Sequence, residues 1–213
     1  MNALWGSTLP EGLSIVDKYR ILGRPQRKLI PYNTWKPGEL VAPIKVPISF
    51  CSEKFYLADF GTALQIGSLA VSDAPIVIPP QEYCSPERLH GATPHYSCDM
   101  WSYMCVFSDL YFGGPLFRCF NDVVACLGPV SADLKGKYLW PKFSEDRWYD
   151  QNTTATGLED RLQLHQPKVS STEMKLLLSV LKRGFALEPK HRLTADQLLQ
   201  NPDFNTLINL YCG

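Results

Sequence analysis

Apolar residues recur at helical spacing in four stretches of the second half of the chain, and each stretch predicts a helix. The first, over 99–112, is apolar nearly all round, which is typical of a helix at the centre of a core. The second is amphipathic, over 117–127, and Gly128-Pro129 ends it. A third is predicted over 171–183, where Ser170 and Glu173 have the spacing of a capping box. The fourth begins at 195 after a threonine N-cap.

The remaining stretches lack helical periodicity. Short apolar runs at 2–5 and 55–58 predict two short strands. Between them, five prolines interrupt residues 25–47, so we expect a long proline-rich connecting segment up to about residue 54. Residues 131–168 are polar and aromatic-rich, and we expect loops and short helical turns there. The pattern therefore predicts a mainly α fold with a few short strands.

The composition narrows the class of protein. With 213 residues, 45% of them hydrophobic and 20% charged, the chain is long enough for one substantial core or one large lobe of a bigger domain. The 21 basic residues balance the 21 acidic ones, which gives no electrostatic reason to expect nucleic acid or a membrane surface as a partner. There is no signal-peptide pattern and no apolar run of membrane-spanning length, and the seven cysteines form no CxxC pair. We expect reduced thiols and a cytoplasmic or nuclear protein.

The candidate chemistry lies at the end of the predicted strand over 55–58. Asp59-Phe60-Gly61 follows this strand, and Cys84-Ser85-Pro86-Glu87-Arg88 follows the next loop, with Glu87 28 residues after Asp59. An acid at a strand end, on a backbone that is free to turn, can hold a cation. Magnesium–phosphate sites are commonly built in this way.

The two motifs in this order resemble the start and the end of the activation segment of protein kinases. Together with Asp99-Met100-Trp101-Ser102 and Pro189-Lys190-His191-Arg192-Leu193, they resemble the C-terminal lobe of a eukaryotic protein kinase over essentially the whole chain. Tyr19-Arg20-Ile21-Leu22-Gly23 and Leu127-Gly128-Pro129 are similar to the SR-protein-kinase-like branch of the CMGC group found in fungi. The resemblance implies one kinase C-lobe over 1–213, made of a strand and proline-rich insert (1–54), an activation segment (55–88) and a helical subdomain (97–213).

The resemblance also implies roles for the residues near the strand end. Asp59, Phe60 and Gly61 match the cofactor-binding motif, in which Asp59 holds Mg²⁺ between the ATP phosphates and the packing of Phe60 sets the active or inactive position. Asn2 matches the asparagine that binds a second Mg²⁺, because a strand follows it. The alternative is that Asn2 is only the second residue of a frayed terminus.

Other matched residues have structural roles in the family. Glu87 and Arg192 match a buried ion pair that ties the activation segment to the end of the lobe. Asp99 and Trp101 match the start of the core helix, where Asp99 would brace the catalytic loop. An acid stabilised by the helix dipole is the simpler explanation of Asp99. Candidate phosphorylation sites are Thr62, Ser68 and Ser72.

Several kinase motifs do not occur in the sequence. It contains no GxGxxG, and His191-Arg192-Leu193 has leucine where the catalytic aspartate of HRD would stand. Lys45, in Val41-Ala42-Pro43-Ile44-Lys45, lies too close to Asp59 to be the lysine that contacts ATP, so we interpret it as an exposed loop residue. The other histidines, His90, His95 and His165, have no spacing that indicates a metal site or a nucleophile.

Two functions therefore remain open. The first is the C-terminal part of an ATP-dependent serine/threonine protein kinase acting on protein substrates, and the branch resemblance implies substrates rich in Arg and Ser. The second is an inactive pseudokinase-like binding module. Both predict exposed apolar surface where a small lobe, or a second copy of the chain, would dock. Mg²⁺ and ATP are the cofactors of the family, and we expect this chain alone not to bind Mg-ATP with useful affinity.

Overall fold

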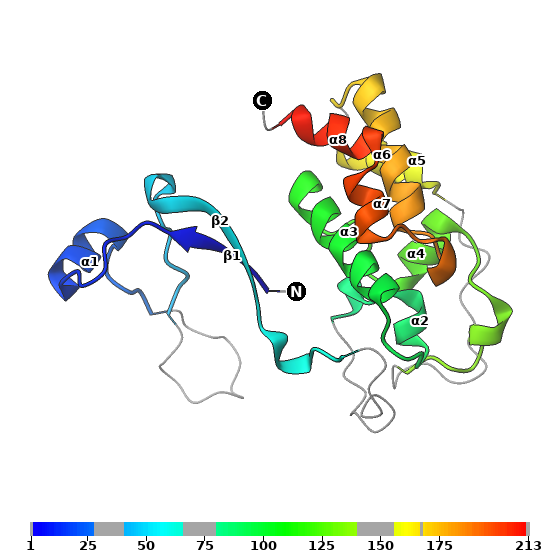
Figure 1. The fold of residues 1–213 in the computed structure, drawn as a ribbon, viewed down its shortest axis with the longest axis horizontal. Coiled ribbons are helices and arrows are strands. Elements are labelled where there is room, and N and C mark those ends of the chain that lie inside the picture. Colours follow the sequence, from blue (N-terminus) through cyan, green and yellow to red (C-terminus); the bar gives the residue numbers. More distant parts are fainter. Residues whose placement is uncertain (1, 28–40, 66–79, 140–155, 167, 212–213) are drawn as a thin grey trace. The chain divides into compact units, whose positions relative to one another are not determined.

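The computed structural model describes residues 2–27, 41–65, 80–139, 156–166 and 168–211. They fall into two compact units (Figure 1). The sheet unit is Met1–Gly61 and the helical unit is Thr62–Gly213. We describe each unit by itself. No helix among the described residues has both the length and the apolar character to cross a membrane.

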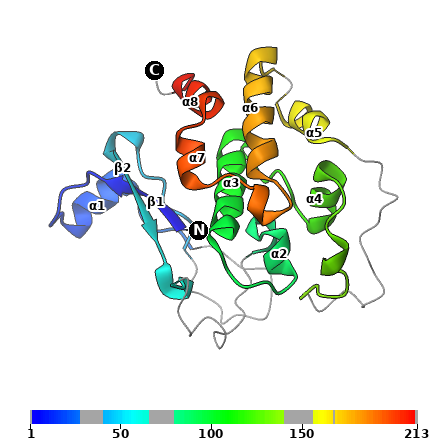
Figure 2. The same cartoon turned by 45° about the vertical axis from the view of Figure 1, so that its right-hand side comes forward.

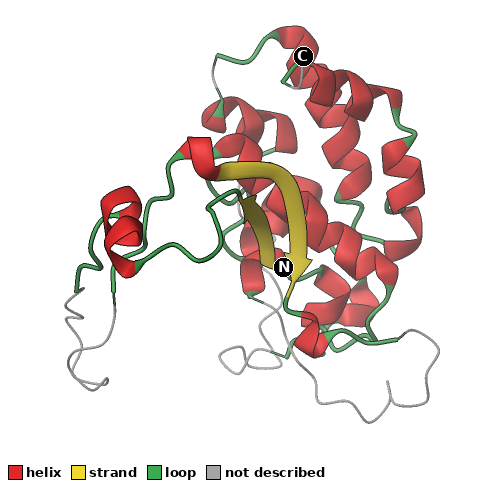
Figure 3. Cartoon of the chain, turned by 60° about the vertical axis from the view of Figure 1, so that its left-hand side comes forward, coloured by secondary structure: helices red, strands yellow, loops and turns green. Residues whose placement is uncertain are grey.

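The sheet unit contains two antiparallel strands, β1 (Asn2–Ser7) and β2 (Cys51–Ala58), as Figure 3 shows. Their register pairs Asn2 with Ala58 and Leu4 with Tyr56, and it becomes irregular near Ser7. None of the residues of this unit whose exposure is described is buried, and the side chains of Phe55, Tyr56 and Leu57 are about half exposed. A two-stranded sheet without a buried face has little packing to stabilise it.

A helix, α1 (Ile15–Leu22), lies in the segment between the strands, where the sequence predicted only a connection. Its N-cap is Ser14, whose hydroxyl accepts from the Asp17 N–H at 3.1 Å and donates to the Asp17 carboxylate at 2.6 Å. Gly23 ends the helix with a positive φ of 78°, which glycine adopts easily, and its N–H bonds to the Tyr19 carbonyl. The Ser-x-x-Asp spacing and the glycine were therefore usable signals that the proline count obscured.

The helical unit is built from seven helices among its described residues. They are α2 (Pro86–Leu89), α3 (Tyr96–Phe112), α4 (Phe120–Leu127), α5 (Leu158–His165), α6 (Ser171–Gly184), α7 (Ala195–Leu199) and α8 (Pro202–Asn209). The four predicted helices are α3, α4, α6 and α7. Helices α2, α5 and α8 were not predicted, and α5 occupies part of the stretch expected to be loops and helical turns.

Caps set the ends of the later helices. Ser170 accepts from the Glu173 N–H at 3.2 Å, while the Glu173 carboxylate bonds instead to the hydroxyls of Tyr111 and Tyr211. The reciprocal capping box predicted at Ser170 is therefore only half formed. A complete one occurs at Thr194, where the side chains and backbones of Thr194 and Gln197 exchange both bonds.

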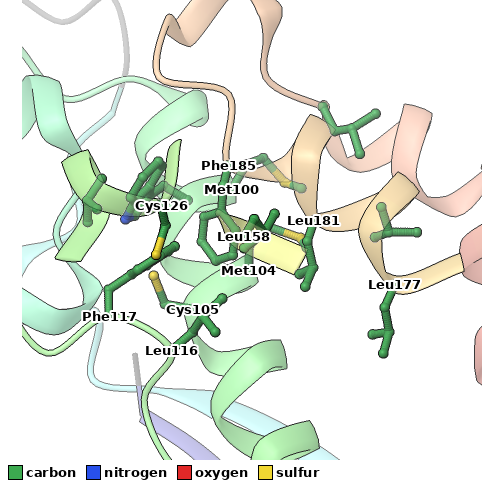
Figure 4. Packing of buried hydrophobic residues seen from close by; sticks show 14 of the residues in the cluster. Met100, Met104, Cys105, Leu116, Phe117, Cys126, Leu158, Leu177, Leu181 and Phe185 are labelled. Carbon is green, nitrogen blue, oxygen red and sulfur yellow. The ribbon is translucent and has the colours of Figure 1, made fainter. Parts of the chain in front are cut away.

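The core of the helical unit lies where α3 and α6 pack together, with α5 and α8 on either side of α6 (Figure 2). Trp101, Phe117 and Phe185 form an aromatic cluster, in which the ring of Phe185 lies 5.0 Å from each of the other two rings. Met104, fully buried, packs beside Gly184 (Figure 4). These apolar side chains belong to one continuous buried core, and each Å² of apolar surface removed from water stabilises the fold by about 25 cal/mol.

One face of α3 is not covered by the described part of the helical unit. Tyr96, Tyr103 and Leu110 recur every seven residues along the helix, and their exposed fractions are 66%, 36% and 77%. The opposite face carries the buried residues, including Trp101 and Met104. The helix that the sequence predicted at the centre of a core is therefore buried on one side only.

Candidate functional site

The first candidate site is the end of β2. Asp59 follows Ala58, the last residue of β2, and Ala58 pairs with Asn2 at the start of β1. Opposite residues of an antiparallel pair lie about 4.5–5.5 Å apart. The register thus brings Asn2 and Asp59, which are distant in sequence, to the same end of the sheet.

The backbone of Asp59 has a left-handed conformation, with φ 63°, and among the described residues it is the one non-glycine with positive φ. Aspartate adopts this region more easily than most residues, at some cost in energy. Residues held in such conformations cluster at functional sites. The backbone therefore turns at Asp59, directly after the last residue of β2.

Phe60 and Gly61 continue from Asp59 into a short 3₁₀ turn, Phe60–Thr62. The ring of Phe60 is 62% exposed. A Cβ atom at Gly61 would lie 3.6 Å from the Asp59 Oδ1 atom, an ordinary contact distance. The role expected for the packing of Phe60 thus stays a prediction.

The donors at the end of β2 suit a hard cation. A carboxylate and an amide are oxygen ligands, which Mg²⁺ prefers, and Mg²⁺ usually keeps several waters and substrate phosphates in its shell. Among the described residues, no cluster of three or more histidines, cysteines or acids could hold a metal by itself. A cation at Asp59 would therefore need further ligands, such as waters or phosphates, and the magnesium role of Asp59 and Asn2 stays a prediction.

The second set of candidate residues lies in the helical unit, around the Glu87 carboxylate. Glu87 is in the first turn of α2, and Arg192 follows the 3₁₀ turn Pro189–His191. Arg192 Nη1 donates to Glu87 Oε1 at 2.7 Å, and Nη2 donates to Oε2 at 3.1 Å. Both residues are buried, with exposed fractions of 8% and 4%. The structure thus pairs the two residues in a bidentate ion pair.

Further contacts hold the Arg192 guanidinium in place. It donates to the carbonyl oxygens of Ala186, at 3.1 Å from Nε, and of Ser97, at 2.7 Å from Nη1. It also lies over the ring of Trp101, 5.0 Å from the centroid. All its hydrogen-bonding atoms therefore have acceptors, which a buried ion pair needs in order to offset its desolvation.

The environment of Glu87 keeps it ionised. Burial raises the pKa of the carboxyl, but the hydrogen bonds and charge of Arg192 outweigh burial, so the pKa is lowered. The Cys98 thiol adds a further hydrogen bond, with its Sγ atom 3.3 Å from Oε1. Burial in turn raises the pKa of Cys98, so its thiol stays protonated and can donate.

Asp99 lies in the first turn of α3, next to these residues, and keeps solvent access. The protein packed around its carboxyl removes part of its water and raises its pKa. Asp99 stands in the first turn, where a helix dipole favours an acid, but its raised pKa shows that desolvation outweighs that effect, so both the helix-dipole interpretation and the bracing role stay predictions.

The histidines occupy structural positions. His90 is buried, with Nδ1 2.6 Å from the Pro86 carbonyl, and its ring meets those of Phe120 and Tyr138 edge to face. Burial lowers the pKa of His90 and of His165. His95 is the N-cap residue of α3. These placements agree with the interpretation of satisfied or surface histidines.

Some of the loop residues singled out in the sequence lie among the described residues, and others do not. Lys45 is exposed, as expected for a loop lysine. Of the phosphorylation candidates, Ser68 and Ser72 lie outside the described residues, and Thr62 ends the 3₁₀ turn after Asp59. The six described cysteines are free thiols.

Sequence reasoning missed the groups that surround the ion pair. The carbonyls of Ser97 and Ala186 and the thiol of Cys98 are brought to it by tertiary packing, and no local motif marks them. A second missed contact joins the Tyr83 hydroxyl to Asp109 at 2.7 Å, which raises the pKa of Tyr83 to about 12. It connects the segment before α2 to α3.

Comparisons with known proteins agree with the motifs. The family model described as "Protein kinase domain" matches residues 48–204. The match includes Asp59, Glu87 and Arg192 and leaves out β1 and α1.

Several kinases are similar to this chain. Dual specificity protein kinase lkh1 of Schizosaccharomyces pombe is 29% identical over 210 residues, covering 88% of this chain and 30% of that protein. Cell division control protein 2 homolog 1 of Trypanosoma brucei brucei is 29% identical over 161 residues, covering 70% and 52%. Serine/threonine-protein kinase AFC3 of Arabidopsis thaliana is 26% identical over 175 residues, covering 73% and 42%. The chain thus spans between about a third and a half of the length of these relatives.

Proposed function

Because this chain belongs to the protein kinase domain family, we propose that it is the C-terminal part of an ATP-dependent serine/threonine protein kinase. The observation that carries the proposal is Asp59, an acid in a left-handed conformation at a strand end that the register shares with Asn2. Phosphoryl transfer depends mainly on positioning and on charge stabilisation, for which such a carboxylate is suited.

In this proposal some residues bind the cofactor and others have a structural role. Asp59 and Asn2 would hold magnesium, which neutralises the charge of the ATP phosphates when bound. The positive φ at Asp59 turns the backbone at the end of β2, and the Asp59 carboxylate lies close to the backbone of Gly61 in the following turn. Glu87 and Arg192 hold the end of the activation segment on the helical unit, and their role is structural.

The uncovered stripe of α3 supports the view that further chain segments complete the kinase. Tyr96, Tyr103 and Leu110 expose apolar surface that no described residue of 62–213 covers. Burying such a stripe against another helix would be favourable. The proposal therefore places the catalytic base, the ATP-contacting lysine and the glycine-rich loop in other parts of a longer protein.

The alternative proposal is a catalytically inactive kinase-like binding module. It is supported by a cavity of about 650 Å³ in the helical unit, lined by residues that include Cys126, Leu158 and Phe185, which is large enough for a side chain of a partner. The preference for Arg/Ser-rich substrates and the SR-protein-kinase-like branch stay predictions, since the names of the three relatives above concern neither.

The transcript sequence upstream of Met1 separates the two proposals. We expect an in-frame run of the HxDxxx type directly before Met1, and a stop codon there would contradict the kinase proposal. The protein extended by that sequence should transfer the γ-phosphate of radiolabelled ATP to a basic protein substrate. Asp59→Asn should lower this rate at least a hundredfold, and an equal rate would contradict the role of Asp59.

Binding of Mg-ATP to the 213-residue chain is a second measurement that tests the proposal. In calorimetry we expect no micromolar binding of Mg-ATP, because Asp59 alone supplies few of the contacts that a nucleotide needs. Micromolar binding that Asp59→Asn leaves unchanged would place the nucleotide elsewhere.

A further inference from the structure

Helix α1 (Ile15–Leu22) has only eight residues, and none of them is buried. Ser14 and Gly23 define its two ends, but the described residues supply little packing that would hold it. Isolated helices shorter than about 12–15 residues are marginal in water, and helices in proteins owe most of their stability to the packing of an apolar face. A further packing partner for α1 is therefore expected.

One face of α1 is apolar. Ile15, Tyr19 and Leu22 follow one another at helical spacing, and Val16 lies beside them. The exposed fraction is 67% for both Ile15 and Val16 and 41% for Tyr19, while Leu22 is half-buried. This spacing is typical of helices whose apolar face packs against a partner protein.

Cations border this apolar face along both edges. Lys18 lies at one edge and Arg20 at the other, each one helical turn from an apolar residue of the face. Arg24, just after the helix, has its guanidinium 5.9 Å from the centroid of the Tyr19 ring. In paired helices, residues at the edges of the apolar seam form ion pairs with the partner helix.

The segment around α1 is positively charged, although the chain as a whole is neutral. Residues 8–27 contain four cations and two acids, and the described residues 41–50 add one lysine and no acid. One of the two acids, Asp17, is already paired with Arg20, at 3.3 Å. Cations thus exceed acids by three in these described residues, and charge complementarity favours an acidic partner.

The family comparison separates α1 from the candidate chemistry. The helix lies outside residues 48–204, which match the protein kinase family model, and it contains no candidate ligand for magnesium. The proposed phosphoryl transfer therefore does not use α1, and its apolar face is open to a separate function.

A protein partner fits this face better than a membrane surface does. Binding to a bilayer grows with the apolar area that a helix buries, and eight residues make a helix only about 12 Å long. In a pair of helices, by contrast, the apolar side chains of both helices are buried, and the cations at the edges meet acids at fixed positions.

From this apolar face and its cationic edges we propose that α1 docks an acidic amphipathic helix of a partner protein. The apolar side chains of the two helices pack together, and acids of the partner lie opposite Lys18, Arg20 and Arg24. Docking stabilises α1 itself, so its backbone amides exchange with solvent more slowly in the complex.

Fluorescence anisotropy with the whole 213-residue chain tests the proposal. The probe is a fluorescein-labelled peptide of three copies of the heptad Glu-Leu-Ala-Gln-Leu-Glu-Ala, whose leucines form a seam with glutamates along both edges. One comparison peptide carries serine in place of every leucine, and another carries lysine in place of every glutamate. We expect saturable binding of the probe and at least tenfold weaker binding of each comparison peptide. A comparison peptide that binds as tightly as the probe would overturn the proposal, as would the absence of saturable binding.

Variants of the apolar residues locate the binding. Ile15→Ser/Val16→Ser removes the most exposed apolar side chains of α1, and serine has a helix propensity similar to that of isoleucine and valine. We expect this double variant to bind the probe at least tenfold more weakly. The matched control is Tyr96→Ser/Leu110→Ser, which removes similarly exposed side chains from the uncovered face of α3 and should bind within twofold of the parent chain. Equal losses in the two double variants would overturn the proposal.

Variants of the cations test the edges of the face. Lys18→Gln/Arg20→Gln removes both charges, and we expect it to bind the probe about threefold to fivefold more weakly. The matched control is Lys135→Gln/Lys175→Gln, which neutralises two exposed lysines of the helical unit. Equal effects of these two double variants would contradict the proposal, because they would indicate attraction to the net charge alone. Circular dichroism of all variants without peptide confirms that they are folded.

Hydrogen exchange and lipid vesicles complete the test. With the probe bound, amides of residues 15–22 should exchange several-fold more slowly, and unchanged exchange there would overturn the proposal. The alternative occupant is a vesicle of equal parts phosphatidylcholine and phosphatidylserine. If the chain sediments with these vesicles, Ile15→Ser/Val16→Ser does not, and the probe fails to bind, the face belongs to a membrane and the proposal is wrong.

Discussion

The two units of this chain differ in what stabilises them and in what they carry. The helical unit has a continuous core and a buried ion pair with all its hydrogen-bonding atoms satisfied. The sheet unit has two strands and no buried residue among those described, yet it carries Asp59, the candidate for the chemistry. The comparison teaches that the residues that hold the helical unit together and Asp59 lie in different units, so we expect that each can be disturbed without the other.

Breaking the ion pair should have the largest effect on the helical unit. Glu87→Ala or Arg192→Ala leaves a buried charge without its partner, which costs about 3–5 kcal/mol of unfolding free energy. Urea denaturation followed by circular dichroism at 222 nm measures this, because the signal is mainly from helices.

The double variant Glu87→Met/Arg192→Met is the control for that experiment. It removes both charges, so we expect it to lose much less than the sum of the single variants. Additive losses would show that the two residues do not act as a pair.

A smaller loss is expected from Gly184→Ala. The added Cβ would lie 2.7–2.9 Å from three atoms of the buried Met104 side chain, so the side chain must shift. Such overpacking costs about 1–3 kcal/mol, and the better helix propensity of alanine returns about 1 kcal/mol. We expect a net destabilisation of about 1 kcal/mol. Gly114→Ala is the control, since a Cβ there meets no atom within 4 Å.

Acidification should weaken the helical unit in two separate pH ranges. Burial lowers the pKa of His90 in the folded chain. On acidification the His90 imidazole is therefore protonated at a higher pH in the unfolded chain than in the folded one, and stability falls as the pH drops below about 6.5. Glu87 also has a lowered pKa, and its contribution is lost only as the pH falls below about 4.3.

A comparison of His90→Phe with the parent chain isolates the upper range. The variant should lose part of the decrease between pH 6.5 and 5, while His165, whose pKa is lowered as well, keeps the rest. Identical pH profiles of stability for the two proteins would show that His90 does not titrate differently on folding.

Asp59→Asn should have the smallest effect on stability. Asparagine tolerates the left-handed region as well as aspartate does, and Asp59 belongs to the other unit. We expect the unfolding free energy of the helical unit to stay within about 0.5 kcal/mol. A loss similar to that of Glu87→Ala would mean that the two units are strongly coupled.

Sequence patterns predicted the parts of the fold that have local causes. The four helices over α3, α4, α6 and α7 were found from their apolar spacing and caps, and the mainly α class followed from them. Helix α1 was missed because the nearby prolines were given more weight than the Ser14–Asp17 cap. Helix α5 was missed because its apolar face is narrow: Leu158 and Leu162 are its buried residues.

The candidate sites were only partly predictable. The motifs identified Asp59, Glu87 and Arg192 by residue type and by their order along the chain. The exposed face of α3 could not be predicted from the helix itself, because its exposure depends on which other segments pack on it. The cavity in the helical unit was equally unpredictable, because Phe185, Leu158 and Cys126 come from three helical segments that meet only in the folded unit.

Native-state hydrogen exchange of the whole chain tests the division between the units most directly. We predict that amides of α3 and α6 exchange only through unfolding of the helical unit, with opening free energies that fall steeply as denaturant is added. Amides of β1 and β2 should exchange orders of magnitude faster, through openings that depend little on denaturant. If the β2 amides and the α6 amides share one opening free energy and one denaturant dependence, the chain is a single cooperative unit and the account is contradicted.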